Sequence, residues 1–563
     1  MSKEKKGKEL RLSIDGMTCD SCAIHVRTAL ERVSGVELVE LQSWTEGSAR
    51  VVTVGNVLDK LLEDAVRQAG YKASVESRKD IVGRPIFPVM PKSSGYDLVV
   101  IGSGSAGIAA SIRAAELGYK VALIERGVVG GTCVNIGCVP SKVLIRAAEA
   151  YHSAKHTQFQ GINTSAGELN WKDIIKQKNS LVAQLRKEKY IDVIEHYKPN
   201  ITLLKGAAKF SRENSILLDD GTTLNPSRII IATGARPKFL KIQSLTDTSI
   251  LTSTTLMDVE TLPESLIIIG GRSIALELGQ AFLRFGTKVT ILQRSETIIP
   301  DNEPEVIEAL TEYLTAEGMR IITGVEVKSV TGEAEKTVTV QKEGTTQEYH
   351  ASEILMAVGV APNTDDMGLH DAGVELDESG FIKIDSQMRT SNQSIFAAGD
   401  VTTMPKFVYV AAAAGGIAAE NALKNSSKKL DLSVMPSVLF SSPQIGAVGM
   451  LESEAKRAGY DIKVSILPLK YVPRALVAHD VRGLIKLVAD KKSNILLGAQ
   501  VLAEEAGEII QTAAMAVLMG QKYGFTVTDL QQMLFPYLVQ VEGIKLASLA
   551  FDKDVTKLSC CAG

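Results

Sequence analysis

The sequence has little of several features that mark other classes of protein. With 62 basic and 65 acidic residues its formal net charge is −3, and a non-specific nucleic-acid binder needs a basic excess or stripe. No apolar run approaches the about 20 residues that a transmembrane helix requires, and the charged N-terminus leads into no apolar signal core. Hydrophobic residues at 45% and charged residues at 23% argue against wholesale disorder. We expect a folded cytoplasmic protein of about four domains, with no nucleic-acid partner and no stable membrane insertion.

Cysteine is scarce, and its placement is informative. A secreted disulfide scaffold would be shorter and much richer in cysteine. Here only six cysteines occur, and they form three close pairs, in which two sulfurs could share one ion or exchange one disulfide; chance pairing of buried cysteines is the alternative. The pairs are Cys19/Cys22, Cys133/Cys138 and Cys560/Cys561.

Residues 1–76 have the pattern of a small α+β domain with the βαββαβ order of a ferredoxin-like fold. The first predicted helix follows Cys22, with Val26 and Leu30 spaced to bury one face. Cys19 and Cys22 share one exposed loop, where they could hold Cu(I) or Hg(II) in near-linear geometry; a thioredoxin-like redox role is the alternative. The predicted strands cover 10–14, 36–41, 49–54 and about 71–75, the second helix begins near Leu58, and a linker covers 77–95.

A glycine fingerprint follows a buried strand that begins at Asp97. Gly102 permits a tight turn, Gly104 lets the backbone approach a pyrophosphate, and Gly107 lets helix and strand pack closely. The helix N-terminus then offers free N–H groups to the phosphates. Glu125 ends the next strand, where it can bind ribose hydroxyls. This segment predicts a dinucleotide-binding domain.

A second, modified fingerprint follows the strand over 266–269. Gly270 is present, but Arg272 takes the second glycine position and Ala275 the third. The Arg272 side chain would either crowd the pyrophosphate or pair with it. The next strand ends in Gln293 and Arg294 without an acidic residue, which favours a 2′-phosphate and therefore NADPH over NADH.

Three segments carry a family resemblance: Gly130–Lys142 with its Cys-x4-Cys pair, Ala232–Pro237, and Ser394–Asp400. They resemble the flavin-dependent pyridine nucleotide–disulfide oxidoreductases. The resemblance implies an α/β fold with two Rossmann-like domains and an α+β dimerisation domain. It places an FAD domain at 96–243 and 367–431, an NADPH domain at 244–366 and a dimerisation domain at 432–563. It also implies that Lys142 pairs with Glu277 near the flavin, and that FAD is contacted at Gly127, Thr132, Ala208, Thr233, Gly234, Asp400 and Val408.

The spacing of the central cysteine pair requires an irregular backbone. Five residues of regular helix rise about 7.5 Å, whereas a disulfide needs Cα atoms within roughly 7 Å. We therefore expect distorted backbone between Cys133 and Cys138, for which Gly137 and Pro140 are suitable. A helix N-terminus would lower a thiol pKa there. A purely structural disulfide is the alternative.

The C-terminal part departs from members of the family that reduce organic disulfides. Those members carry a His–Pro pair, and this chain has Tyr537 in its place; tyrosine, with a pKa of about 10, is a poor proton shuttle. The chain then ends in Cys560 and Cys561, adjacent thiols suited to a soft ion. These departures resemble the branch of the family that reduces Hg(II) to Hg(0), in which Tyr190 and Tyr537 match tyrosines that line the metal site; ordinary interface packing is the alternative. The loop at Cys19 resembles heavy-metal-associated domains.

The sequence thus predicts an NADPH-dependent mercury(II) reductase with bound FAD. The resemblance implies a homodimer with shared active sites, in which Cys560 and Cys561 of one subunit pass Hg(II), as a thiol complex, to Cys133 and Cys138 of the other. An organic-disulfide reductase with an appended metal domain is one alternative. Another is a metal-sequestering or copper-delivery protein in which the flavoprotein fold is a relic, but the intact Lys142, Glu277 and Asp400 argue against it.

Overall fold

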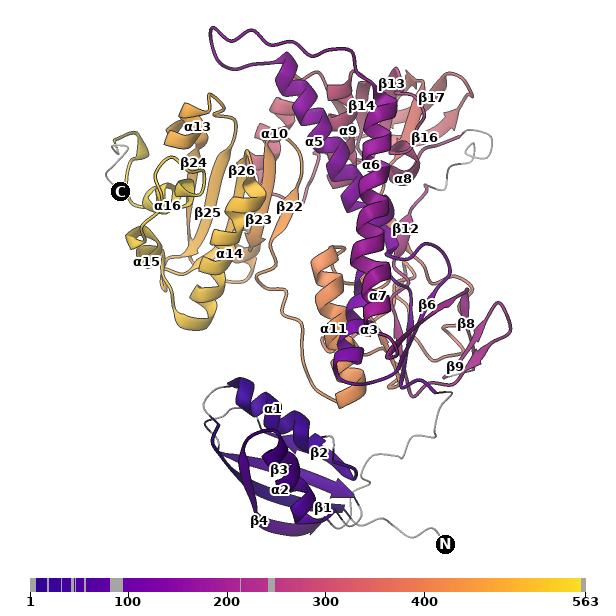
Figure 1. The fold of residues 1–563 in the computed structure, drawn as a ribbon. Coiled ribbons are helices and arrows are strands. Elements are labelled where there is room, and N and C mark those ends of the chain that lie inside the picture. Colours follow the sequence, from indigo (N-terminus) through magenta and orange to yellow (C-terminus); the bar gives the residue numbers. More distant parts are fainter. Residues whose placement is uncertain are drawn as a thin grey trace. The chain divides into compact units, whose positions relative to one another are not determined.

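The computed structural model describes residues 7–17, 20–31, 33–41, 45, 47–54, 57–81, 95–212, 214–240, 242 and 249–557. The chain divides into two compact units, residues 1–91 and 92–563 (Figure 1). Of the predicted metal-binding cysteines, Cys19, Cys560 and Cys561 lie outside the described residues. In the part of the chain that is described, no helix is long and apolar enough to cross a membrane.

The first unit has the predicted βαββαβ order. Its four strands form an antiparallel sheet in the order β2-β3-β1-β4. Val26 and Leu30 are fully buried, as predicted, and Leu62 and Val66 form the buried face of the second helix. The last strand is longer than predicted because it pairs with β1 as far as Ile81. The elements are β1 (Gly7–Asp15), α1 (Asp20–Glu31), β2 (Val36–Glu40), β3 (Ser48–Val54), α2 (Asp59–Gln68) and β4 (Lys72–Ile81).

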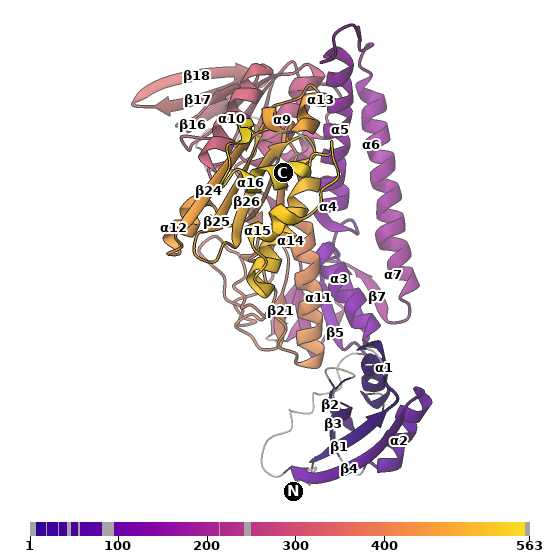
Figure 2. The same ribbon diagram turned by 90° about the vertical axis from the view of Figure 1, so that its left-hand side faces the viewer.

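The second unit contains a five-stranded parallel sheet in the order β21-β11-β5-β6-β7. The inner strands are mostly apolar because both faces of a parallel sheet are buried; all four residues of β5, for example, are buried, whereas burial alternates along the edge strand β7. Helix α3 packs against the sheet and against α11 (Figures 1 and 2). The elements are β5 (Leu98–Ile101), α3 (Ser105–Glu116), β6 (Val121–Glu125), β7 (Ile201–Lys205), β11 (Arg228–Ile231), β21 (Ile395–Ala397) and α11 (Val408–Lys424).

Several elements lie between the strands of this sheet in the sequence. Helices α5 and α6 form a long antiparallel pair (Figure 2). The elements are α4 (Gly131–Ile136), α5 (Cys138–Lys155), α6 (Trp171–Arg186), the π-helix Lys187–Ile191, α7 (Asp192–His196), β8 (Ala208–Arg212), β9 (Ser215–Leu218), β10 (Thr223–Leu224) and β12 (Ala235–Pro237), which pairs with β20 (Val360–Pro362).

A second parallel sheet, in the order β15-β14-β13-β19, carries the second fingerprint. Its strand β13 leads into α9, which packs against α5, the helix that begins at Cys138. A three-stranded antiparallel sheet, β16-β17-β18, adjoins it. The elements are α8 (Ser253–Leu256), β13 (Ser265–Ile269), α9 (Ser273–Phe285), β14 (Lys288–Leu292), α10 (Pro304–Ala316), β15 (Arg320–Ile322), β16 (Glu326–Thr331), β17 (Lys336–Lys342), β18 (Thr345–Ala351) and β19 (Glu353–Met356).

The C-terminal part is an α+β layer built on an antiparallel sheet, β22-β23-β26-β25-β24. Helix α14 covers β23 and β26, and its buried alanines and isoleucines join the core of this part. The elements are β22 (Ser437–Leu439), β23 (Gln444–Gly449), α12 (Glu452–Arg457), β24 (Ile462–Pro468), a 3-10 helix at Leu469–Tyr471, α13 (Pro473–Val477), β25 (Leu484–Asp490), β26 (Leu496–Ala503), α14 (Ala506–Tyr523), α15 (Val527–Gln532), α16 (Glu542–Leu549) and a 3-10 helix at Val555–Lys557.

Candidate dinucleotide and dithiol site

The first fingerprint turn forms a cradle of bare backbone. Gly102 has a φ of +104°, and a Cβ there would lie 2.3 Å from the Ala232 carbonyl oxygen. A Cβ on Gly107 would lie 1.8 Å from the Gly102 oxygen. Gly104 is the N-cap of α3, and Gly131 approaches it so closely that a Cβ on Gly131 would lie 2.6 Å from its Cα. Only glycine fits these approaches, and they leave the N-terminus of α3 open to an anion.

Glu125 fastens this turn to the loop after β6. Its Oε2 accepts hydrogen bonds from the Ser103 amide at 3.0 Å and the Ser103 hydroxyl at 2.6 Å, and its Oε1 accepts one from the Gly127 amide at 2.7 Å. A carboxylate has about four lone-pair sites, so capacity remains for a ribose hydroxyl. Glu125 therefore orders the turn in addition to its predicted role.

The other residues predicted to contact FAD lie at the ends of neighbouring elements. Thr233 and Gly234 follow β11, and the Thr233 hydroxyl donates to the Asn363 carbonyl at 2.8 Å. Asp400 follows β21, and burial raises its pKa. The remaining three are Thr132 in the first turn of α4, Ala208 at the start of β8 and Val408 at the start of α11.

The backbone is broken between the two central cysteines, as their spacing predicts. Helix α4 ends at Ile136, Gly137 has φ −129° and ψ −106°, and α5 begins at Cys138. A Cβ on Gly137 would lie only 3.0 Å from the Thr132 carbonyl oxygen. Both thiols are free; Cys133 is half-buried and Cys138 exposed. The break places the two thiols close enough for each to shift the pKa of the other.

The proximity of the two thiols gives them different pKa values. The hydrogen bond from Cys133 and the ammonium of Lys142 lower the pKa of Cys138 to about 7. The same hydrogen bond, together with burial, raises the pKa of Cys133. Near neutral pH about half of the pairs therefore carry a thiolate on Cys138, which is the form that binds soft metals.

Lys142 and Glu277 form the predicted pair. Lys142 is one turn beyond Cys138 on α5, and its Nζ lies 2.7 Å from Glu277 Oε2 on α9. The other oxygen, Glu277 Oε1, accepts a hydrogen bond from the Phe440 amide at 3.0 Å. The Lys142 ammonium also lies 4.4 Å from the centre of the Phe440 ring. Three distant segments of the chain thus meet at this ion pair.

The two predicted tyrosines come from different parts of the unit. Tyr190 lies in the π-helix, a form that is often found at functional sites. An added Cβ on Gly130 would lie 3.5 Å from the Tyr190 ring, and burial raises the pKa of its phenol, which also hydrogen-bonds Ser105. The charges of the cysteine pair raise this pKa further. Tyr537 belongs to the C-terminal part, between α15 and α16, and is 51% exposed.

The second fingerprint repeats the backbone geometry of the first. Gly270 has a φ of +120°, and a Cβ there would lie 2.3 Å from the Ala357 carbonyl oxygen, which matches the approach of Gly102 to Ala232. Ala275 is fully buried against the sheet. Arg272 is the N-cap of α9, and its exposed guanidinium forms an ion pair with Asp301.

Gln293, which the sequence predicts together with Arg294 to favour a 2′-phosphate, lies against the second fingerprint turn. It is buried, with an exposed fraction of 7%, and its amide nitrogen lies 3.4 Å from the Thr297 carbonyl oxygen. The side chain is turned inward because it packs against Gly271, where an added Cβ would lie 3.1 Å away. Arg294, which is exposed at the end of β14, is therefore the candidate that remains for a 2′-phosphate.

Comparison with known proteins identifies the family. A model of the pyridine nucleotide-disulphide oxidoreductases matches residues 96–415, and a model of their dimerisation domain matches residues 435–548. The chain belongs to the pyridine nucleotide-disulphide oxidoreductase family. A heavy-metal-associated domain model also matches residues 11–72, which lie within the first unit.

Individual relatives extend the likeness over the full chain. A mercuric reductase from Lysinibacillus sphaericus is 43% identical over 99% of this chain and all of its own length. One from Bacillus cereus is 42% identical over 99% of this chain and 87% of its own. Among solved structures, the HOCl-induced flavoprotein disulfide reductase RclA from Escherichia coli is 29% identical, with a TM-score of 0.72 over 80% of this chain and 99% of its own.

Sequence reasoning missed two residues of this oxidoreductase site, Phe440 and Gln280. Phe440 lies 163 residues from Glu277 in the chain, and no local motif marks it. Gln280 is three residues after Glu277 on α9 and therefore on the same helix face. Its amide accepts from the Ser442 N–H at 2.8 Å and donates to the Ser442 carbonyl at 2.9 Å. The helical spacing from Glu277 was the available signal for Gln280.

We expect Lys142→Met to raise the apparent pKa of the reduced cysteine pair. In the unaltered protein the Cys138 thiolate should appear as the pH rises through about 7. Without the neighbouring ammonium the thiolate is less stabilised, so this transition should move upward, towards the ordinary thiol value of about 8.5. The measurement is the ultraviolet absorbance of the thiolate against pH in the reduced protein. Lys155→Met at the far end of α5 is the matched control and should leave the transition in place.

Proposed function

We propose that this protein reduces Hg(II) to Hg(0) with electrons from NADPH, using bound FAD and the Cys133/Cys138 pair. The single observation that carries this proposal is the full-length likeness to mercuric reductases at about 42–43% identity. It spans the heavy-metal-associated domain as well as the oxidoreductase core. The geometry of the dithiol supports the same chemistry.

The residues present fit a dinucleotide at each fingerprint. The glycine cradle at Gly102, Gly107 and Gly131 has no room for side chains and opens on a helix N-terminus, which suits the pyrophosphate of FAD. Bound FAD would supply the redox chemistry that links NADPH to the dithiol. Glu125 would hold the FAD ribose, Asp400 the ribityl–phosphate region, and the exposed Arg294 the 2′-phosphate of NADPH.

The dithiol is suited to bind the substrate Hg(II). Two sulfur ligands suffice for a soft ion that prefers linear coordination, and Cys138 supplies a thiolate near neutral pH. We assign the exchanging role to Cys133 and the flavin-side role to Cys138. Tyr190 borders the pair with a phenol, which competes for Hg(II) far less than an imidazole would. The absence of a histidine at Tyr537 disfavours the organic-disulfide alternative, because proton transfer to a leaving thiol needs a group of nearly neutral pKa.

The family and its dimerisation domain indicate a homodimer. We propose that Hg(II) arrives in the cytoplasm as a thiol complex and is captured by Cys19 and Cys22. It then passes to Cys560 and Cys561, and from this tail to the Cys133/Cys138 pair of the partner subunit, whose site Tyr537 completes. Each transfer exchanges one thiolate for another, so the ion is never released free. The tail and Cys19 lie outside the described residues.

The deciding experiment measures NADPH oxidation by the purified yellow protein with Hg(II) in excess thiol. We expect oxidation that depends on Hg(II), with loss of volatile mercury in equal molar amount, since NADPH and Hg(0) each account for two electrons. Glutathione disulfide and lipoamide serve as comparison substrates. Oxidation driven only by an organic disulfide would contradict the proposal and place the enzyme among the disulfide reductases.

A further inference from the structure

The Lys142–Glu277 pair is completed by a residue of the C-terminal part. Strand β22 ends at Leu439, which pairs with Ile445 of β23, so the Phe440 amide is free of the ladder and donates to Glu277 at 3.0 Å. The Phe440 ring lies 4.4 Å from the Lys142 ammonium. One residue therefore touches both members of the ion pair, the carboxylate with its backbone and the ammonium with its ring.

The turn that carries Phe440 is held rigidly. Ser441 is fully buried, and its hydroxyl donates to the Pro443 carbonyl at 2.7 Å, which closes the turn between β22 and β23. Gln280 binds both backbone groups of Ser442, as a neighbouring strand would. Such a two-point contact fixes the turn relative to α9, the helix that also carries Glu277.

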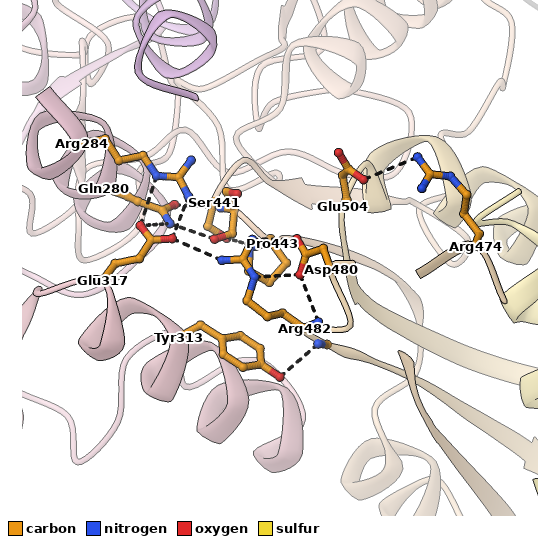
Figure 3. A network of polar contacts seen from close by, with 12 residues as sticks. Gln280, Arg284, Tyr313, Glu317, Ser441, Pro443, Arg474, Asp480, Arg482 and Glu504 are labelled. Atoms are coloured by element: carbon orange, nitrogen blue, oxygen red, sulfur yellow. Dashed lines mark hydrogen bonds and ion pairs between the residues drawn. The ribbon is translucent and has the colours of Figure 1, made fainter. Parts of the chain in front are cut away.

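Gln280 is itself oriented by a buried charge network (Figure 3). Its amide nitrogen also donates to Glu317 at 3.0 Å, and Glu317 forms a two-pronged ion pair with Arg284 at 2.7 and 3.1 Å. Arg284 is 5% exposed and Glu317 11%. Arg482 joins the network from the C-terminal part and binds Asp480 at 2.7 Å. Buried, fully paired groups of this kind leave little freedom to the amide between them.

We propose that Phe440 is a positioning residue for Lys142. Its ring holds the ammonium by a cation–π contact while its amide holds Glu277, so that the ion pair keeps one geometry beside the dithiol and the flavin site. The Gln280 clamp is the support that makes this possible. The flavin part of the inference rests on the proposed function; the contact with Lys142 does not.

The test measures the rate at which an amine-acylating reagent modifies Lys142 in the FAD-loaded protein, by peptide mass spectrometry. Phe440→Leu keeps an apolar side chain but removes the ring face. We expect Lys142 to react about fivefold faster, because loss of the cation–π contact frees the side chain and favours the neutral amine, which is the form that is acylated. Phe440→Tyr keeps the ring and should stay within about twofold of the unaltered rate. Lys406, which lies 4.1 Å from the Phe381 ring, is the internal reference and should not change.

Two further variants test the same contact between Phe440 and Lys142. If Phe440→Leu does not fold, Phe440→Met replaces it, with the same expected increase. Gln280→Leu keeps the Phe440 side chain but removes the hydrogen bonds that hold its turn to α9. It should therefore also raise the rate at which Lys142 is acylated. The flavin midpoint potential of Phe440→Leu should differ from that of the unaltered protein, and the potential of Phe440→Tyr should equal it.

The labelling needs neither NADPH nor mercury, so its result is separate from that of the mercury assay. Equal Lys142 rates in the Leu variant and the unaltered protein would overturn the proposal. So would an equal increase in the Leu and Tyr variants, which would show that Phe440 acts by packing alone.

Discussion

Replacing Cys138 by serine should lower mercury-dependent NADPH oxidation by at least about 10³-fold, the scale on which loss of an essential nucleophile acts. The exchange removes the thiol whose pKa is lowered to about 7 and leaves a hydroxyl, which is a poor ligand for a soft ion. Cys133→Ser should have a loss of similar size, because Hg(II) then has only one sulfur ligand in the site. The measurement is the steady-state rate with Hg(II) and excess thiol.

The control for both cysteine variants is electron transfer that bypasses the dithiol. NADPH oxidation with ferricyanide, which takes electrons directly from a flavin, should continue in Cys138→Ser, and the yellow colour should remain. Mercury-dependent oxidation at the unaltered rate in either variant would show that the pair is not the reduction site. Loss of both activities together would indicate a folding or cofactor defect, which retention of the flavin absorbance tests.

The double variant Cys560→Ala and Cys561→Ala should slow turnover of tightly thiol-bound Hg(II) by about 10²-fold or more. A tethered pair of thiols presents Hg(II) to the dithiol at a high effective concentration. Such tethering typically strengthens overall binding by about 10²- to 10⁴-fold. Without it, each Hg(II) must reach Cys133 directly from a bulky thiol complex. The measurement is the rate as a function of thiol excess.

Hg(II) with only halide ligands is the matched control for the tail. Halides exchange readily, so the double variant should lose much less activity with this substrate than with thiol-bound Hg(II). A second control is Ser559→Ala, which changes the tail without removing a thiol and should behave as the unaltered protein. Equal turnover of thiol-bound Hg(II) by the double variant and the unaltered protein would exclude the relay.

Features that depend on local backbone could be predicted from the sequence. Gly102 and Gly270 have positive φ and backbone neighbours where a Cβ would stand, so glycine at those places in a strand–turn–helix pattern indicates the fingerprint directly. The five-residue step from Cys133 to Cys138 likewise required a break in the helix, and Gly137 provides it. The βαββαβ order of the first unit followed from the spacing of its apolar residues.

The sequence by itself determined the two fingerprints and the cysteine pairs, because each is a constraint among residues close together in the chain, and its resemblance to a family implied the fold class. Only the tertiary structure decided how the site is held and charged. Lys142 and Glu277 are 135 residues apart, and Phe440, which contacts both, belongs to another layer of the unit. Gln293 turns inward because Gly271 leaves it space, which no pattern in its own strand signals. The lowered pKa of Cys138 and the raised pKa of Cys133 arise from which sulfur donates and where Lys142 lies, and such directional contacts exist only once distant segments have packed.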